Sequence, residues 1–217
     1  MTKSKHSTHK TARVLLIVLP IALFVLIAFS LYADIATGFE SWVYAESTEH
    51  MSPLLTSCVK AITHLGDTIT VLLVCLVLFV VPPLRRNYAL PVALSTIVAA
   101  ILNIVLKQMF ARQRPDILAL VTETSYSFPS GHAMISMAMY GAIVFLAWRY
   151  MRSLQAKILT TVIFAVLVAA IGFSRVYLGV HYATDVVAGW CLGLAIALGV
   201  VFLFDGTRKK KKANNTS

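Results

Sequence analysis

Three residues with phosphate chemistry lie close together between two apolar stretches, in the segment Ser174 to Asp185, SRVYLGVHYATD. Arg175 carries a permanent positive charge with a planar set of donors that suits phosphate. His181 is a possible nucleophile or proton carrier at neutral pH. Asp185 follows it by four residues, so on a helix its carboxylate faces the same way and can orient the imidazole. A plain polar loop between two membrane helices is the alternative, but this spacing favours a catalytic site.

Two other segments carry matching residue types. Lys107 and Arg114 follow one apolar stretch, and Ser130, Gly131 and His132 precede the next. Ser130 is suited to cap a helix whose free amides bind phosphate oxygens, and Gly131 lets the backbone approach an anion closely. Two cations about 6 Å apart repel by roughly 3 kcal/mol at an effective dielectric constant of about 20, and a phosphate relieves that repulsion.

The elements that must position these residues are membrane helices. The chain has 217 residues, of which 59% are hydrophobic and 13% charged, and its mean hydropathy is +0.80. Soluble domains are usually about 45–50% apolar and about 25% charged. We therefore predict an all-α polytopic membrane protein with six transmembrane helices in a bundle. The predicted spans are Val14–Ala33, Leu65–Val81, Tyr88–Met109, Ala133–Trp148, Ile158–Phe173 and Val186–Phe204.

The domain prediction follows from these spans. We expect a basic tail at 1–13, one six-span domain at 14–204 and a second basic tail at 205–217. The first apolar run lacks a small-x-small cleavage site and is long enough to span, so we interpret it as an anchor and not as a signal peptide. The three cysteines are scattered and are expected to be packing residues, not metal ligands.

The distribution of charge predicts the orientation. With six spans, 14 of the 19 Lys and Arg residues fall on the face that holds both termini. Positive charge stays inside, so both termini are predicted to be cytoplasmic, in a plasma or inner membrane. The opposite face holds Lys60, Lys107, Arg112, Arg114 and Arg175. Helix direction then brings all the phosphate-type residues to one depth on the extracytoplasmic side. The net charge of +10 lies mainly in the tails and short loops, which favours contact with anionic lipid over nucleic acid.

Four features outside these segments carry smaller predictions. Phe39, Trp42 and Tyr44 predict a short helix at the outer interface. His64 and Asp67 are expected to form an interfacial polar cap, although they could line the mouth of a site. Arg112 is expected to face lipid headgroups. A last pair, Gly189 and Gly193, predicts close helix packing, within the subunit or between subunits of a homo-oligomer.

The three phosphate-type segments together resemble the motifs of the type 2 phosphatidic acid phosphatase superfamily, the lipid phosphate phosphatases. The matching residues are Lys107-x6-Arg114-Pro115, Pro129-Ser130-Gly131-His132 and Ser174-Arg175-x5-His181-x3-Asp185. The resemblance covers the chain from about Ile62 to Phe204. It extends to small bacterial members that act on phosphatidylglycerophosphate or undecaprenyl diphosphate.

The resemblance implies a role for each matching residue. His181 would take the phosphoryl group as a phosphohistidine, with Asp185 orienting it. His132 would protonate the leaving oxygen and then activate water. The phosphate cradle would consist of Lys107, Arg114, Ser130, Gly131 and Arg175. No metal or cofactor is implied, and a single carboxylate at the site is too few for a magnesium cage.

Alternatives to a lipid phosphatase remain. A lipid phosphotransferase would use the same cradle and pass the phosphoryl group to another acceptor. A transporter for phosphate or a phosphorylated solute is disfavoured, because the charges cluster at one end of the helices without a polar path across the membrane. Vanadium haloperoxidases share the anion cradle but are soluble, which this composition argues against.

Overall fold

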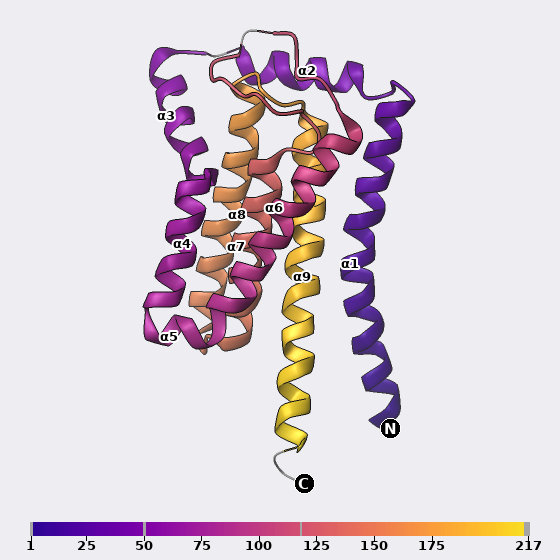
Figure 1. The fold of residues 1–217 in the computed structure, drawn as a ribbon, viewed down its shortest axis with the longest axis vertical. Coiled ribbons are helices and arrows are strands. Elements are labelled where there is room, and N and C mark those ends of the chain that lie inside the picture. The colour runs from indigo at the N-terminus through magenta and orange to yellow at the C-terminus, as the bar shows by residue number, and fades with distance from the viewer. Residues whose placement is uncertain (1, 50, 118, 215–217) are drawn as a thin grey trace.

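The fold is a bundle of long helices capped at one end by a short transverse helix (Figure 1). The computed structural model describes residues 2–49, 51–117 and 119–214, with side chains described between Thr11 and Asp205. In chain order the elements are α1 (Thr2–Tyr32), α2 (Thr37–Thr48), α3 (Pro53–Thr63), η1 (His64–Gly66), α4 (Thr68–Val80), α5 (Pro82–Leu84), η2 (Arg85–Ala89), α6 (Leu90–Phe110), α7 (Gly131–Tyr150), α8 (Leu154–Tyr177) and α9 (Ala183–Asn214). The prediction of an all-α membrane bundle is confirmed.

Five helices are long and apolar enough to cross a membrane, and the predicted total of six is reached when the pair Pro53–Gly66 and Thr68–Val80, bent by 50°, is counted as one broken span. The predicted helix Leu65–Val81 corresponds to α4, but the helix before it and the bend between the two are not predicted. The chain already turns into a helix at Pro53, after a Ser52 cap whose hydroxyl accepts from the amide of Leu55, and it breaks at η1.

The central pair of the bundle is α7 and α9, which approach closely because of two glycines. A Cβ added at Gly193 would lie 2.4 Å from the carbonyl oxygen of Met134, and one at Gly189 would lie 2.8 Å from that of Ser130. The predicted small-residue contact is therefore used within one subunit. It also brings the start of α7, which carries His132, against the start of α9, which carries Asp185.

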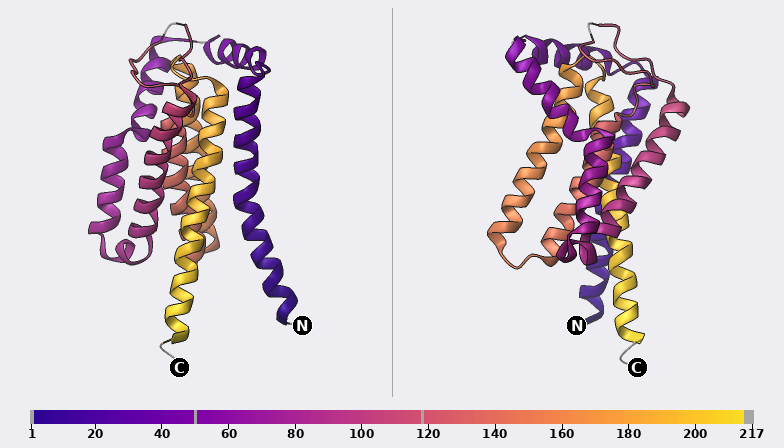
Figure 2. Two further views of the ribbon diagram at one scale, coloured as in Figure 1. Left: turned by 45° about the vertical axis from the view of Figure 1, so that its right-hand side comes forward. Right: turned by 60° about the vertical axis from the view of Figure 1, so that its left-hand side comes forward.

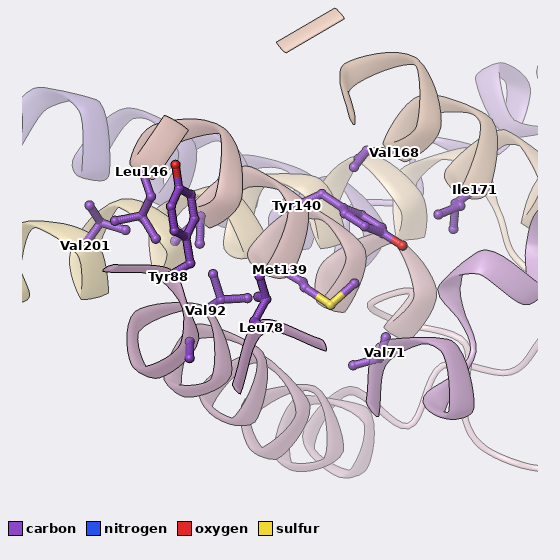
Figure 3. Packing of buried hydrophobic residues seen from close by; sticks show 13 residues of the cluster. Val71, Leu78, Tyr88, Val92, Met139, Tyr140, Leu146, Val168, Ile171 and Val201 are labelled. Atoms are coloured by element: carbon purple, nitrogen blue, oxygen red, sulfur yellow. The ribbon is translucent and has the colours of Figure 1, made fainter. Parts of the chain in front are cut away.

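The apolar core lies below this contact and joins α4, α6, α7, α8 and α9 (Figure 3). Val92, Met139, Leu146 and Ile171 are almost fully buried there. By contrast, apolar side chains along α1, α4 and α8 are widely exposed, as expected for surfaces that face lipid. The core thus holds the motif-bearing helices rigidly, while the outer helices complete the bundle.

The capping helix α2 lies across the end of the bundle opposite the start of α1 and the end of α9 (Figure 2). The predicted outer helix is present, with Phe39 and Trp42 exposed and Glu40 buried beneath them. At the other end, α1 and α9 extend as helices through most of the predicted tails. The tail side chains before Thr11 and after Asp205, and residues 215–217 as a whole, lie outside the described part. Between α6 and α7, the chain at 111–117 and 119–130 runs at the α2 end (Figure 2).

Candidate active site

A pocket of about 390 Å³ collects the phosphate-type residues near the end capped by α2. Five of the eight predicted site residues line it: Lys107, Arg114, Gly131, His132 and His181. Both predicted imidazoles therefore face one cavity, and they reach it from different elements. The other three predicted residues, Ser130, Arg175 and Asp185, are buried behind this lining.

The first functional unit is the pair His181 and Asp185 at the start of α9. The imidazole Nδ1 lies 3.3 Å from Asp185 Oδ2, and the same oxygen accepts from the amide of Tyr182 at 3.0 Å and from the Ser127 hydroxyl. On the other side of the ring, Nε2 lies 3.3 Å from Nη1 of Arg114. A guanidinium can only donate, so Nε2 accepts and the ring proton belongs on Nδ1. Ser127 was missed by the sequence analysis.

This arrangement presents a neutral imidazole to the pocket. Burial lowers the pKa of His181 to about 4, with Asp185 acting in the opposite direction and Arg114 adding to the effect. At pH 7 the ring is therefore unprotonated at Nε2. A neutral imidazole whose free nitrogen faces a cluster of cations is suited to attack a bound phosphorus atom.

Two of the cations are arranged by the segment between α6 and α7. Lys107 Nζ donates to the Ser125 hydroxyl at 3.1 Å and to the carbonyl of Tyr126. Arg114 Nε donates to the carbonyl of Ser125 at 2.7 Å, and its Nη1 donates to the carbonyl of Val180 at 2.6 Å. These contacts, all to uncharged oxygens, hold both positive groups at the pocket that His181 lines.

The third cation, Arg175, is 2% exposed and lies at the end of α8. Its Nη1 donates to Thr63 Oγ1 at 2.8 Å, and its Nη2 pairs with Glu123, a carboxylate that the sequence analysis missed. Glu123 also lies 3.6 Å from Nη2 of Arg114. Burial alone would raise the pKa of Glu123, but Arg175 and Arg114 lower it below its ordinary value. Glu123 is therefore an anion at neutral pH.

Two buried polar atoms of the predicted cradle have no partner within the described part of the chain. They are Ser130 Oγ and Arg175 Nε. Ser130 does occupy the N-cap position of α7, but its side chain makes no capping bond, so the capping role predicted for its hydroxyl is wrong. An unpaired buried polar group costs about 1–3 kcal/mol, and an anion reaching both groups would remove that cost. Gly131 follows directly, and a Cβ there would crowd Asn103 Oδ1 at 3.0 Å.

The second imidazole, His132, belongs to a chain of hydrogen bonds that reaches the surface. Its Nε2 lies 2.7 Å from Asp67 Oδ1, and Asp67 Oδ2 lies 2.6 Å from Nδ1 of the exposed His64. For Asp67 the alternative of lining a site is therefore the correct one, whereas His64 is exposed and lies outside the pocket lining. Both residues sit at the break in the second span, and Asp67 lines the pocket.

Arg112 also differs from the sequence expectation. It does not face headgroups, but donates to Asp185 Oδ1 at 2.6 Å and to both oxygens of Glu40 at 2.8 and 2.7 Å. The orienting carboxylate of the predicted dyad is thus linked to the transverse helix α2. No group of three or more His, Cys, Asp or Glu side chains able to hold a metal ion occurs among the described residues.

Comparisons with known proteins show which family this chain resembles. A sequence model of the PAP2 superfamily matches residues 88–209, more than half of the chain. Phosphatidylglycerophosphatase B of Bacillus subtilis (strain 168) is 42% identical over 113 residues, covering 52% of this chain and 54% of that protein. An undecaprenyl-diphosphatase of Sulfolobus acidocaldarius is 37% identical over 114 residues, 50% of this chain and 51% of that protein. The matched region thus spans about half the length of these curated relatives.

A solved structure is similar over a greater length. The crystal structure of a transmembrane PAP2-type phosphatidylglycerolphosphate phosphatase from Bacillus subtilis superposes with a TM-score of 0.79 at 30% sequence identity. The match covers 89% of this chain and 97% of that one. The similarity therefore extends beyond the region that carries the motifs.

Proposed function

Because this chain belongs to the PAP2 superfamily, we propose that it is a metal-independent phosphatase that removes a phosphoryl group from a membrane lipid phosphate. The observation that carries the proposal is the shared pocket of His181 and His132, bordered by Lys107 and Arg114, with the unpaired Ser130 Oγ and Arg175 Nε buried behind its lining. A phosphate oxygen would supply the missing acceptor for both groups, while Lys107 would balance its charge.

The proposed first step is a transfer of the phosphoryl group to the enzyme. The lone pair of His181 Nε2 attacks phosphorus, and the bond from phosphorus to the lipid oxygen breaks. The leaving oxygen takes a proton from His132, which Asp67 holds beside the pocket at 2.7 Å. Asp185 stabilises the positive charge that develops on the His181 ring.

The proposed second step returns the enzyme to its starting state. His132, now neutral, takes a proton from water, and the water oxygen attacks phosphorus. The bond between nitrogen and phosphorus breaks, its electron pair returns to His181 Nε2, and inorganic phosphate leaves. Lys107, Arg114 and Arg175 stabilise the equatorial oxygens in both steps, the part that metal ions play in kinases.

The substrate class follows from the site and from the relatives. A lipid phosphate, either a phosphomonoester or a diphosphate, keeps its phosphate at the α2 end while its chains remain in the bilayer. The names of the relatives make phosphatidylglycerophosphate and undecaprenyl diphosphate the first substrates to test, with phosphatidic acid beside them. Following the charge distribution, we propose that both termini are cytoplasmic and that the active site of the 14–204 domain opens to the extracytoplasmic side, in a monomer or a homo-oligomer.

The test is phosphate release in detergent from each of these three lipids. We expect His181→Ala to abolish release and Lys60→Ala, an exposed lysine outside the pocket, to leave it unchanged. Activity should persist in a strong chelator. Equal rates in wild type and His181→Ala would reject the nucleophile, and loss of activity that added magnesium restores would reject the metal-free mechanism. Release that requires an acceptor lipid would identify a phosphotransferase instead.

A further inference from the structure

The guanidinium of Arg112 joins the dyad carboxylate to the transverse helix α2. Its Nη1 donates to Asp185 Oδ1 at 2.6 Å and to Thr184 Oγ1 at 3.0 Å. Its Nη2 donates to both oxygens of Glu40 at 2.8 and 2.7 Å. The flat face of the guanidinium lies over the ring of Tyr182, 3.9 Å from the ring centre. Its stacked face and both terminal nitrogens are therefore used by these contacts.

The burial of these groups separates this contact from an ordinary surface ion pair. The side chain of Asp185 is 0% exposed, that of Glu40 4% and that of Arg112 19%. Two carboxylates buried close together would repel each other strongly, and one cation between them removes that repulsion. Burial alone would lower the pKa of Arg112, but Asp185 and Glu40 raise it above its ordinary value.

The two oxygens of Asp185 have different partners, which fixes the orientation of the carboxylate. Oδ1 accepts from Arg112, while Oδ2 accepts from Ser127 and faces Nδ1 of His181 at 3.3 Å. Rotation of the carboxylate would break contacts on both sides. Arg112 is in turn held by Glu40, which belongs to an element far away in sequence and also accepts from the Thr184 hydroxyl.

From this geometry we propose that Arg112 and Glu40 are positioning residues for the proposed phosphatase reaction, holding Asp185 charged and turned toward His181, so that α2 forms part of the catalytic apparatus. Neither residue lines the pocket that contains the two imidazoles. Their effect on the reaction therefore passes through Asp185 and does not depend on contact with phosphate.

The kinetic test uses Arg112→Gln, Arg112→Lys and Glu40→Gln. We expect Arg112→Gln to lower kcat about 10- to 100-fold, the effect of losing one charge-assisted hydrogen bond in the transition state, with KM within about twofold of wild type because the cradle is intact. Arg112→Lys should recover part of kcat, since an ammonium can contact Asp185 but cannot grip both carboxylates at once. Glu40→Gln, which retains a hydrogen-bond acceptor, should show a smaller loss.

A matched control and a chemical rescue separate positioning from folding. Arg149→Gln removes a more exposed arginine from its pairing with Asp205, at 3.6 Å, near the other end of the bundle, and should leave kcat unchanged. Arg112 also lines a cavity of about 510 Å³ beside α1 and α2. Methylguanidinium should enter this cavity and restore part of kcat to Arg112→Ala. If Arg112→Gln does not fold, Glu40→Gln and this rescue still test the inference. Wild-type kcat in a folded Arg112→Gln, even with a lowered Tm, would overturn it.

A measurement without substrate distinguishes this inference from the proposed function. The proton resonance of His181 Nδ1–H, identified by its loss in His181→Asn, reports the contact with Asp185. We expect it to shift in Arg112→Gln and Glu40→Gln but not in Arg149→Gln, and an unchanged resonance in the first two would overturn the inference. A shift in a protein that releases no phosphate from any lipid would reject the proposed function and leave the positioning role standing.

Discussion

At the scale of single residues, the two nitrogens of His181 are set apart by their neighbours. Nδ1 faces Asp185 and Ser127, while Nε2 faces Arg114 and the pocket. The same element, the start of α9, therefore supplies both the reactive nitrogen and the group that orients it. A ring with the opposite tautomer would place N–H against a guanidinium, where two donors meet.

The protonation of His181 should reflect this environment. Since burial lowers the pKa to about 4, we expect the ring to stay neutral from pH 8 down to about pH 5 and to take up a proton only as the pH falls through about 4. Nitrogen NMR of histidine-labelled protein in detergent, with His181→Asn for assignment, measures this directly. Protonation near the ordinary value of about 6.5 would contradict the buried, neutral nucleophile.

How far single residues can be predicted from the sequence depends on whether they belong to a spaced motif. Four motif residues lie beside predicted helix ends, and their types and spacing indicate phosphate chemistry. The structure brings these four to one pocket: Lys107, Arg114, His132 and His181. Ser127, Glu123, Arg112 and Glu40 could not be predicted in the same way, and for Asp67 the sequence offers a place at the mouth of a site only as the alternative to an interfacial cap. Each acts across a tertiary contact from an element whose direction the sequence does not specify. The signal for Arg112 was present, because a cation on the outer face violates the charge rule, but headgroups were an adequate explanation for it.

At the scale of elements, the break in the second span shows what hydropathy alone misses. Apolar length predicted a short helix from Leu65, whereas the span runs from Pro53 and bends at His64–Asp67. A Cβ added at Gly66 would lie 2.8 Å from Ile171 Cγ2 and 3.0 Å from His132 Cδ2. The glycine thus lets the bend pack against the second imidazole. A bend that depends on such a contact between distant helices has no local sequence signature.

The contact between α7 and α9 offers a test at this scale with a control on the same helix. Gly193→Ala would place a methyl group 2.4 Å from the Met134 carbonyl oxygen, so the helices must separate, and we expect a loss of about 1–3 kcal/mol in stability and reduced activity. At Gly199 nothing among the described atoms lies within 4 Å of an added Cβ. Gly199→Ala should leave the thermal inactivation temperature in detergent unchanged or slightly higher, because alanine favours the helix. Equal behaviour of the two variants would show that this contact does not limit stability.

At the scale of the whole molecule, the two ends of the bundle differ in the elements and residue types that they contain. One end holds the pocket, the segment 111–130 and α2 (Figure 1). The other end holds the start of α1, the end of α9 and the turn between α7 and α8 (Figure 2). In the sequence, most of the Lys and Arg residues belong to these segments. Six spans and the charge asymmetry could be predicted from composition, because both depend on sums over many residues. The contact between α7 and α9 decides which helices form the centre of the bundle. In the sequence, only the two glycines of α9 indicate that contact.

The proposed orientation can be tested with a cysteine that the chain already contains. Cys58 is exposed in α3, at the end that holds the pocket, and Arg152 is exposed in the turn between α7 and α8 at the other end. With the other two cysteines replaced by alanine, we expect a membrane-impermeant maleimide to modify Cys58 in intact spheroplasts. In a Cys58→Ser background, Arg152→Cys should react only after permeabilisation, because the basic end faces the cytoplasm. The reverse pattern would place the pocket on the cytoplasmic side, so that the enzyme would act on lipid phosphates of the inner leaflet while the chemistry of the two imidazoles stayed the same.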